Sequence, residues 1–504
     1  MNEAIVQIHS SVGKLIPELI LVINACVYFL VGAFVDEPAG NQGGRAKHRW
    51  GGLTLIALAF AAYMAFMYGE PETKEHLGAF RVDQLAWFVR GLSLLTGAAL
   101  LLMSWNKVDQ EHVAEHHACL LLIITGVNLI ALANDLIGLF LALELISIST
   151  YLLLYLGKRD RQGEEATIKY FLLSVFSSAI VLFGFSYFYG IAGTTNLTAS
   201  KLAIIAGSSQ MMPAALGLAL VMIVAGLGFR LTAVPFHFYA PDVFQGSSIT
   251  AAALLSFLPK VAGVIALIRL ISVSAIHVSA GAVWTPAAQL DVALFILAAA
   301  SMFIGNVMAL QQTDIRRLLA WSSVAHAGYL LVGIAVTDQV LSAVRPESAV
   351  LFYLAAYGAM TVGSFAVLAM VARNGREIQT IDDLAGLGKK LPIAAGLMTI
   401  FLFGLTGLPP TVGFLGKWNL FVTAWGSQTV LGQWLAIILA VNAAIGAVYY
   451  LRVIAAMFLQ APAEGSRYSV ENAPAVSVLA CAFLTIALFV IPGWLWHFID
   501  LATY

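Results

Sequence analysis

Long apolar stretches follow one another along almost the whole chain, and they constrain its fold more than any other feature. About twenty apolar residues cross a bilayer as an α-helix. By that measure we predict about fourteen transmembrane helices. They lie near residues 15–35, 51–69, 84–105, 117–134, 136–156, 167–192, 214–245, 248–272, 288–310, 317–337, 347–373, 391–424, 429–459 and 473–499. With 60% hydrophobic and 11% charged residues, the chain is far more apolar than a soluble domain, so we expect an all-α polytopic membrane protein.

One apolar stretch, Gly226 to Val261, also contains ionisable residues and helix breakers. The ionisable residues are Arg230, His237, Asp242 and Lys260, and the breakers are Pro235, Pro241, Gly246 and Pro259. Because proline removes a backbone donor and clashes with the preceding turn, we expect helix breaks at Pro235 and Pro259. Irregular backbone at membrane depth must be buried in protein or line a wet cavity. Ionisable groups there indicate a pathway for ions or protons; the alternative is a structural re-entrant turn.

A second stretch, Phe401 to Phe421, has the same character, with a Pro409-Pro410 break and one cation, Lys417. The two interrupted helices are the seventh and twelfth predicted spans, so they cross the membrane in opposite directions. Paired broken helices of opposite direction are typical of inverted repeats with function at the breaks. We therefore predict two inverted five-helix repeats, each containing a broken helix; the alternative is that glycine-rich and proline-rich helices recur by chance. The predicted segments are 1–110 (three N-terminal helices), 111–275 (first repeat), 285–460 (second repeat) and 470–504 (C-terminal helix).

Loop cations indicate how the helices are oriented. One set of alternate loops contains Arg45, Lys47, Arg49, Lys107, Lys158, Arg159, Arg161, Arg316, Arg317, Arg373, Arg376, Lys389, Lys390 and Arg467. The other set contains only Lys14, Lys74, Arg81, Lys201 and Arg345. By the positive-inside rule the first set is cytoplasmic, which places both termini on the non-cytoplasmic side.

Several buried charges are candidates for a proton relay. Glu144 lies deep within its span, where an acid without a partner cation is costly, so we expect a cation beside it. Lys260 and Lys417 are flanked by apolar residues next to helix breaks, and desolvation of such an amine allows it to load and release a proton. Lys169 can serve the same relay, or it can form an ordinary surface pair with Glu165 one turn away.

Histidines and one arginine extend this set. His237 and His326 can pass a proton between their ring nitrogens, although each can equally satisfy a backbone carbonyl. Arg230 cannot release a proton, so its expected role is to pair with Glu144 or to act as an electrostatic gate. We interpret His112, His116 and His117 as a solvated helix start and predict no metal site. The net charge of −1 gives no indication of a nucleic-acid partner.

Five segments together resemble the antiporter-like membrane subunits of respiratory complex I, particularly subunit N of the bacterial NADH:quinone oxidoreductase. They are GLGFRLTAVPFHFYAPDVFQG, SFLPKVA, RRLLAWSSVAHAGYLLVG, IDDLAGLGKKLP and GLPPTVGFLGKW. The resemblance runs from about Leu85 to Met457. It implies fourteen helices in the proton-pumping arm of the complex, with relay positions at Glu144, Lys169, Lys260 and Lys417. The family's usual lysine in the seventh helix is Arg230 here, which puts lysine protonation in the first half in doubt.

The resemblance further implies that the chain binds no cofactor of its own. FMN, iron–sulfur clusters and quinone are expected on partner subunits of the complex, in the bacterial inner membrane. Cys26, Cys119 and Cys481 are scattered singly, which does not support a cluster site on this chain. The expected function is proton translocation driven by electron transfer elsewhere in the complex. Two alternatives remain open: a subunit of a sodium/proton antiporter, and a structural subunit that conducts no protons.

Overall fold

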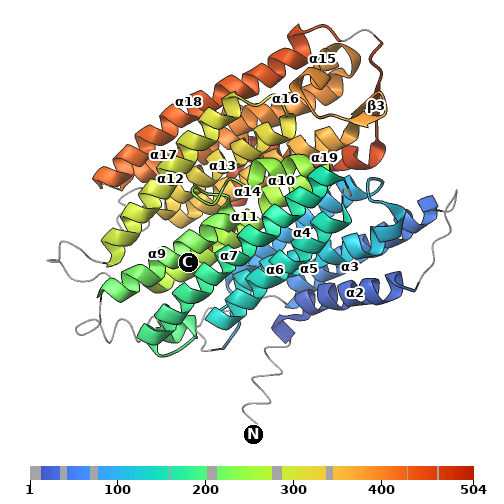
Figure 1. The fold of residues 1–504 in the computed structure, drawn as a ribbon. Coiled ribbons are helices and arrows are strands. Elements are labelled where there is room, and N and C mark those ends of the chain that lie inside the picture. Colours follow the sequence, from blue (N-terminus) through green and yellow to red (C-terminus); the bar gives the residue numbers. More distant parts are fainter. Residues whose placement is uncertain are drawn as a thin grey trace.

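The computed structural model describes residues 13–34, 43–68, 78–157, 160–200, 213–274, 286–336, 344–427, 429–462 and 465–503. These residues form a bundle of long helices that lie side by side, with α2 and α3 at one flank and α18 at the opposite flank (Figure 1). The first helices are α2 (Ile16–Gly32), α3 (Gly43–Tyr68), α4 (Gln84–Ser104), α5 (Val113–Leu132), α6 (Leu136–Leu156), α7 (Arg161–Ala192), α9 (Pro213–Leu231) and α10 (Ala240–Gly246). The remainder are α11 (Ile249–Ser274), α12 (Pro286–Leu310), α13 (Ile315–Ile334), α14 (Pro346–Met370), α15 (Leu387–Lys390), α16 (Pro392–Thr406), α17 (Val412–Gly426), α18 (Val430–Leu459), α19 (Asn472–Val490) and α20 (Pro492–Thr503).

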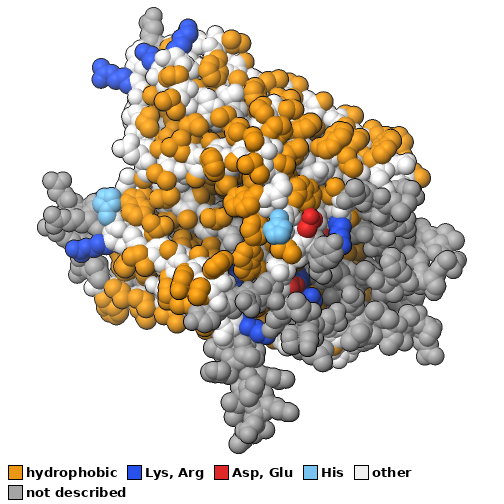
Figure 2. All heavy atoms as spheres, turned by 180° about the vertical axis from the view of Figure 1, so that it is seen from behind, with side chains coloured by type: hydrophobic (Ala, Val, Ile, Leu, Met, Phe, Trp, Pro, Cys, Tyr) orange, Lys and Arg blue, Asp and Glu red, His pale blue; other side chains and the backbone are white. Residues whose placement is uncertain are grey.

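The helices confirm the prediction of an all-α polytopic membrane protein. Among the described residues, ten helices are long and apolar enough to cross a membrane, and three shorter apolar helices accompany them. Large apolar side chains such as Ile148, Phe176 and Phe483 are exposed on the outside of the bundle. Figure 2 shows hydrophobic side chains over most of the described part of one face, with few charges among them. Such a surface suits contact with lipid or with other membrane helices.

Two helices form the centre of the bundle. In the most apolar 18-residue stretch of α14, 100% of the residues are buried inside the protein, and in that of α11, 94% are buried. A helix that is hydrophobic on all sides is typical of such a core position. Lys260 is on α11, so its side chain originates from the most enclosed part of the fold.

Aspartates at the helix starts explain several of the short connections. Asp135 accepts backbone hydrogen bonds at the start of α6, Asp160 at the start of α7 and Asp314 at the start of α13. A carboxylate satisfies the amide groups that lack a partner in the first helical turn and interacts favourably with the helix dipole. These caps fix where each helix begins.

The seventh and twelfth predicted stretches are both interrupted. Residues 232–239 separate α9 from α10, and residues 407–411 separate α16 from α17. Pro235 lies in the first gap, and Pro409 and Pro410 lie in the second. A further interruption at Ile491 divides the last predicted stretch into α19 and α20.

The expected break at Pro259 is wrong, because α11 continues through this residue from Ile249 to Ser274. Proline is tolerated within a membrane helix where neighbouring groups satisfy the backbone carbonyl that it frees. The carbonyl that Pro259 leaves without its helical partner is that of Leu255, four residues earlier. The Tyr357 hydroxyl bonds to the next carbonyl, that of Ser256, at 3.3 Å.

A small antiparallel sheet, which we did not predict, lies outside the helices. Strand β1 (Val371–Arg373) pairs with β2 (Arg376–Glu377) on one side and with β3 (Tyr468–Val470) on the other. Asn374 and Gly375, with φ of 52° and 75°, form the turn between β1 and β2. An Asn-Gly pair is the preferred sequence for this hairpin turn, so the sequence did contain its signal.

The loop charges are only partly described. Lys74, Lys158, Arg159 and Lys201 lie outside the described residues, as does the side chain of Arg45. The start of α5 differs from the expected solvated helix start, because His116 and His117 are 7% and 1% exposed. Packing against neighbouring helices encloses both rings, a contact that their sequence spacing does not predict.

Candidate functional site

Lys260 lies at the first helix break. Its side chain comes from α11 and is 0% exposed. The Nζ atom donates to the Leu231 carbonyl, the last residue of α9, at 2.5 Å, and also to the Thr232 hydroxyl. The last carbonyls of a helix have no intrahelical partner and carry partial negative charge. The end of α9 therefore offers a site for a cation.

Lys417 has the same environment at the second break. Its side chain is 7% exposed and comes from α17. The Nζ atom donates to the carbonyls of Leu405 at 2.8 Å and Thr406 at 3.0 Å, the last residues of α16. It also lies 4.6 Å from the centre of the Tyr329 ring, which favours a cation.

The two breaks thus share one arrangement, a buried amine against the carbonyl end of a half-helix. Among the described residues, neither lysine forms an ion pair with a carboxylate. Dipoles and carbonyls stabilise a buried ammonium less than a carboxylate does, so the cost of desolvation is only partly offset. Such an amine can exist with or without its proton.

A buried histidine, His326, is bonded to tyrosine hydroxyl groups from two neighbouring helices. His326, on α13, makes hydrogen bonds through both ring nitrogens: Nδ1 to the Tyr353 hydroxyl at 2.5 Å and Nε2 to the Tyr450 hydroxyl at 3.1 Å. The Tyr450 hydroxyl in turn bonds to that of Ser322. Because both partners can donate or accept, the imidazole can exchange its proton between nitrogens without losing either bond.

Tyr357 connects this cluster with α11. Its ring stacks on His326 with centroids 4.9 Å apart, and its hydroxyl donates to the Ser323 hydroxyl at 3.1 Å. The same hydroxyl reaches the Ser256 carbonyl on the helix that carries Lys260. The hydrogen bonds of His326 therefore reach α14 through Tyr353 and α18 through Tyr450, whereas its link to α11 through Tyr357 is a ring contact.

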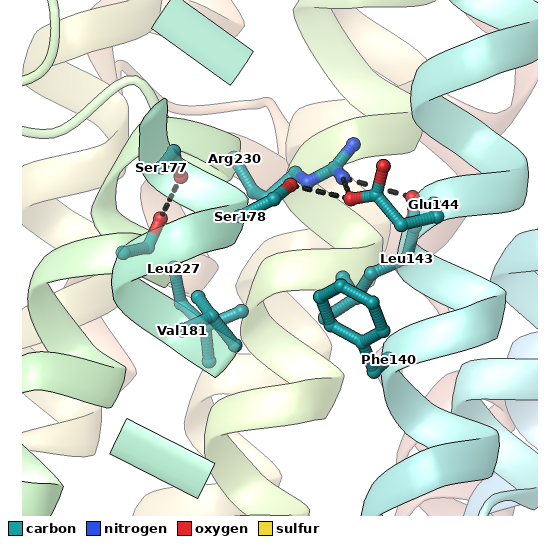
Figure 3. Close-up of a pocket in the computed structure, with 9 residues that line it drawn as sticks. Phe140, Leu143, Glu144, Ser177, Ser178, Val181, Leu227 and Arg230 are labelled. Atoms are coloured by element: carbon teal, nitrogen blue, oxygen red, sulfur yellow. Dashed lines mark hydrogen bonds and ion pairs between the residues drawn. The ribbon is translucent and has the colours of Figure 1, made fainter. Parts of the chain in front are cut away.

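Glu144 and Arg230 face each other in a small crevice between α6, α7 and α9 (Figure 3). An Arg230 guanidinium nitrogen lies 3.8 Å from a Glu144 carboxylate oxygen. The same nitrogen donates to the Leu143 carbonyl at 2.8 Å and to the Ser147 hydroxyl. Ser178 donates to the Glu144 carboxylate. Arg230 is therefore the cation beside Glu144, which spacing along the sequence did not establish.

Lys169 is paired with two carboxylates. Its Nζ atom lies 2.6 Å from Glu165 and 2.6 Å from Asp242, and its side chain is 39% exposed. The ordinary pair with Glu165 thus exists, and Asp242 of α10 adds a partner that we did not predict. No contact of the described residues joins Lys169 directly to Glu144, Lys260 or Lys417.

His237 lies apart from the lysines. It is in the connection between α9 and α10, half-buried, with its ring centroid 5.4 Å from that of Trp321. Within the described part of the chain, no hydrogen bond joins its ring to Lys260 or to His326.

The tyrosines around His326 were not among the predicted site residues. Tyr353 and Tyr357 are four residues apart on α14, and Ser322, His326 and Tyr329 are spaced by four and three residues on α13. Residues at these spacings share one helix face. A polar stripe on an otherwise apolar helix was the signal that could have identified them.

Comparisons with known proteins agree with this geometry. The family model described as NADH:quinone oxidoreductase/Mrp antiporter, TM, matches residues 133–446. A protein of Solibacter usitatus named NADH-quinone oxidoreductase subunit N 1 is 34% identical over 96% of this chain and 96% of its own length. A protein of Anaeromyxobacter sp. named NADH-quinone oxidoreductase subunit N is 36% identical over 95% of this chain and 93% of its own length.

Solved structures share the fold. A chain of respiratory complex I from Thermus thermophilus with bound aureothin has a TM-score of 0.77 and 29% identity, covering 96% of this chain and 99% of that one. A chain of the Mrp complex from Dietzia sp. has a TM-score of 0.78 at 18% identity, covering 98% and 96%, which shows likeness of fold alone. The family model and the nearly full-length relatives together show that this chain belongs to the NADH:quinone oxidoreductase/Mrp antiporter family of membrane proteins, alongside the proteins named subunit N.

Proposed function

We propose that this chain translocates protons as a membrane-arm subunit of NADH:quinone oxidoreductase in the bacterial inner membrane. The observation that carries the proposal is the pair of buried amines, Lys260 and Lys417, each against the carbonyl end of an interrupted helix. The relatives named NADH-quinone oxidoreductase subunit N supply the type of complex. The chain supplies no redox chemistry in this proposal; FMN, iron–sulfur clusters and quinone belong to partner subunits.

The proposed architecture has fourteen membrane crossings with two inverted repeats, 111–275 and 285–460, between an N-terminal segment, 1–110, and a C-terminal helix, 470–504. Two features support it. The interrupted helices α9–α10 and α16–α17 are the seventh and twelfth of the predicted stretches. Each break also has a lysine amine against its first half-helix. The loop cations support placing both termini on the non-cytoplasmic side.

The mechanism begins at the Glu144–Arg230 pair. A change in a neighbouring subunit that draws Glu144 away leaves the Arg230 charge uncompensated. Arg230 cannot release its proton, so its effect on the relay is electrostatic. An unpaired positive charge disfavours further protonated groups nearby, which promotes proton release from Lys260.

The proton then moves through neutral groups toward the second break. His326 with its partners Tyr353 and Tyr450, and the Tyr357 hydroxyl, which bonds to Ser323 and Ser256, supply donors and acceptors for this step. Lys417 receives the proton and releases it when the carbonyl end of α16 moves away. Lys169 and His237 remain proposed members of the relay, reached through solvent or through a rearranged connection.

Methionine substitution of the two lysines tests the proposal. Lys260→Met and Lys417→Met are expected to lower the protons pumped per electron pair in inverted membrane vesicles while the complex stays assembled. Lys390→Met is the matched control, because Lys390 is an exposed lysine at the end of α15. Normal pumping in both buried-lysine variants would overturn the relay and favour a structural subunit.

A sodium/proton antiporter subunit is tested in the same vesicles. The proposal predicts no exchange of protons for sodium when an imposed sodium gradient replaces the electron donor. Exchange under those conditions, lost in Lys417→Met, would favour the antiporter.

A further inference from the structure

Asp242 lies among the charged residues of the first interrupted helix but is not used by the proposed relay. It is on α10, the short second half of that helix. One carboxylate oxygen lies 2.6 Å from the Lys169 Nζ atom of α7, and the other lies 2.7 Å from an Arg317 guanidinium nitrogen of α13. A single carboxylate therefore joins a cation within the proposed first repeat to a cation within the proposed second.

Further bonds hold α10 in this position. Arg317 also donates to the Gln245 side chain at 2.9 Å, and Gln245 donates to Asp314 at 3.2 Å. Arg316 donates to the Ser247 carbonyl at 3.0 Å, where α10 ends. On the other side, a Cβ atom added at Gly246 would lie 2.5 Å from the Gln162 carbonyl of α7. The end of α10 is thus fixed between α7 and α13.

The two cations that share Asp242 differ in chemistry. Lys169 can lose its proton, whereas Arg317 stays charged at all relevant pH values. An ammonium between Glu165 and Asp242 retains its proton, since both carboxylates stabilise the charged form. Arg317 can donate to both carboxylate oxygens of Asp242 through two nitrogens. When the carboxylate turns toward Arg317 in this way, Lys169 loses one of its two counter-ions.

We infer that Asp242 is a shared counter-ion and that Arg317 is a positioning residue, which controls proton release from Lys169 by competing for Asp242. This inference rests on the proposed proton translocation. It adds an electrostatic connection between the two proposed repeats on their cytoplasmic side. Movement of α13 shifts Arg317 relative to Asp242 of α10 and thereby changes the ion pair between Asp242 and Lys169.

The test compares variants of Arg317 in the assembled complex in inverted vesicles. Ion pairs between partly exposed groups shift an equilibrium by about twofold to fivefold, so Arg317→Gln is expected to lower the pumping rate by about that factor. Arg317→Lys keeps the charge and is expected to restore most of the rate. Arg376→Gln, which removes an exposed arginine in β2, is the matched control and is expected to pump as the native complex does.

Asp242→Asn supplies a second, independent test because it keeps the shape of the side chain. Once the shared carboxylate is gone, adding Arg317→Gln is expected to cause no further change. The inference is overturned if Arg317→Gln pumps at the native rate, if Arg317→Lys is as slow as Arg317→Gln, or if the two substitutions act additively. Lys260→Met and Lys417→Met in the same series separate the two proposals. Normal pumping in both would overturn the proposed function, whereas loss of pumping in both beside a normal Arg317→Gln overturns this inference alone.

Discussion

Gly413 on α17 packs directly against the backbone of α16 near the second break. A Cβ atom added there would lie 1.9 Å from the Gly404 carbonyl oxygen and 2.8 Å from the Met360 sulfur. Ordinary contact begins at 3.4 Å, so Gly413→Ala requires a displacement of about 1.5 Å (3.4 minus 1.9). The first obstacle is backbone, which cannot rotate away as a side chain can.

This displacement exceeds what the Lys417 site can absorb. The Lys417 Nζ atom lies 2.8 Å from the carbonyl of Leu405, the residue after Gly404. A separation of about 3.5 Å ends a useful hydrogen bond, so the tolerance is about 0.7 Å. Overpacking typically costs about 1–3 kcal/mol, whereas alanine in place of a helical glycine gains about 1 kcal/mol. We therefore expect modest destabilisation together with a clear loss of pumping.

Proton pumping per electron pair and the thermal stability of the solubilised complex are the two readouts. Gly396→Ala in α16 is the control, because nothing lies within 4 Å of its added Cβ atom. It is expected to pump normally and to be as stable as the native complex or slightly more so. Normal pumping in Gly413→Ala would refute the claim that the Lys417 site depends on the spacing of the two half-helices.

Three further predictions concern other parts of the molecule. Glu18→Gln leaves Arg90 buried without its carboxylate at 2.7 Å, so it is expected to destabilise the protein by about 3–5 kcal/mol in thermal unfolding of the solubilised complex; an unchanged midpoint would contradict this. Arg230→Lys keeps a cation beside Glu144, so pumping in vesicles is expected to persist, and its loss would give the guanidinium a more specific role. Asp383→Asn is expected to speed proteolysis of residues 371–391 at pH 7 and to remove the pH dependence of that rate. Proteolysis at the native rate would contradict a stabilising role of the Asp383 carboxylate. Burial raises the pKa of Asp383, but hydrogen bonds from Thr380 and Gln379 and the charge of Arg373 outweigh this and lower it. The stabilisation is therefore present above the unfolded pKa of about 3.9 and disappears as the pH falls through the lower folded value.

Local sequence signals predicted the two interrupted helices correctly, but they did not predict which prolines break a helix. Pro235 and the Pro409-Pro410 pair stand among other turn-forming residues, and the helices end before them. Pro259 is followed by a long apolar run, and α11 around it is enclosed by other helices. Whether a proline breaks a membrane helix depends on how neighbouring helices pack around it, and those helices lie far away in sequence.

The site residues show the same limit. Depth within an apolar run identified Glu144, Lys260 and Lys417 as buried or half-buried polar groups. Their partners depend on how helices pack, so sequence spacing could not predict that Arg230 lies beside Glu144 or that both lysines contact carbonyl ends. Asp242 and Arg317 are 75 residues apart in the chain, so the sequence could not predict this pair either.

The most direct measurement compares Lys417→Arg with Lys417→Met for protons pumped per electron pair in inverted vesicles, with electron transfer recorded alongside. Arginine keeps the positive charge at the end of α16 but cannot release a proton. If Lys417 carries protons, both variants lose pumping to the same degree. If Lys417→Arg pumps as the native complex does, the charge alone is sufficient, and the relay through Lys417 is wrong.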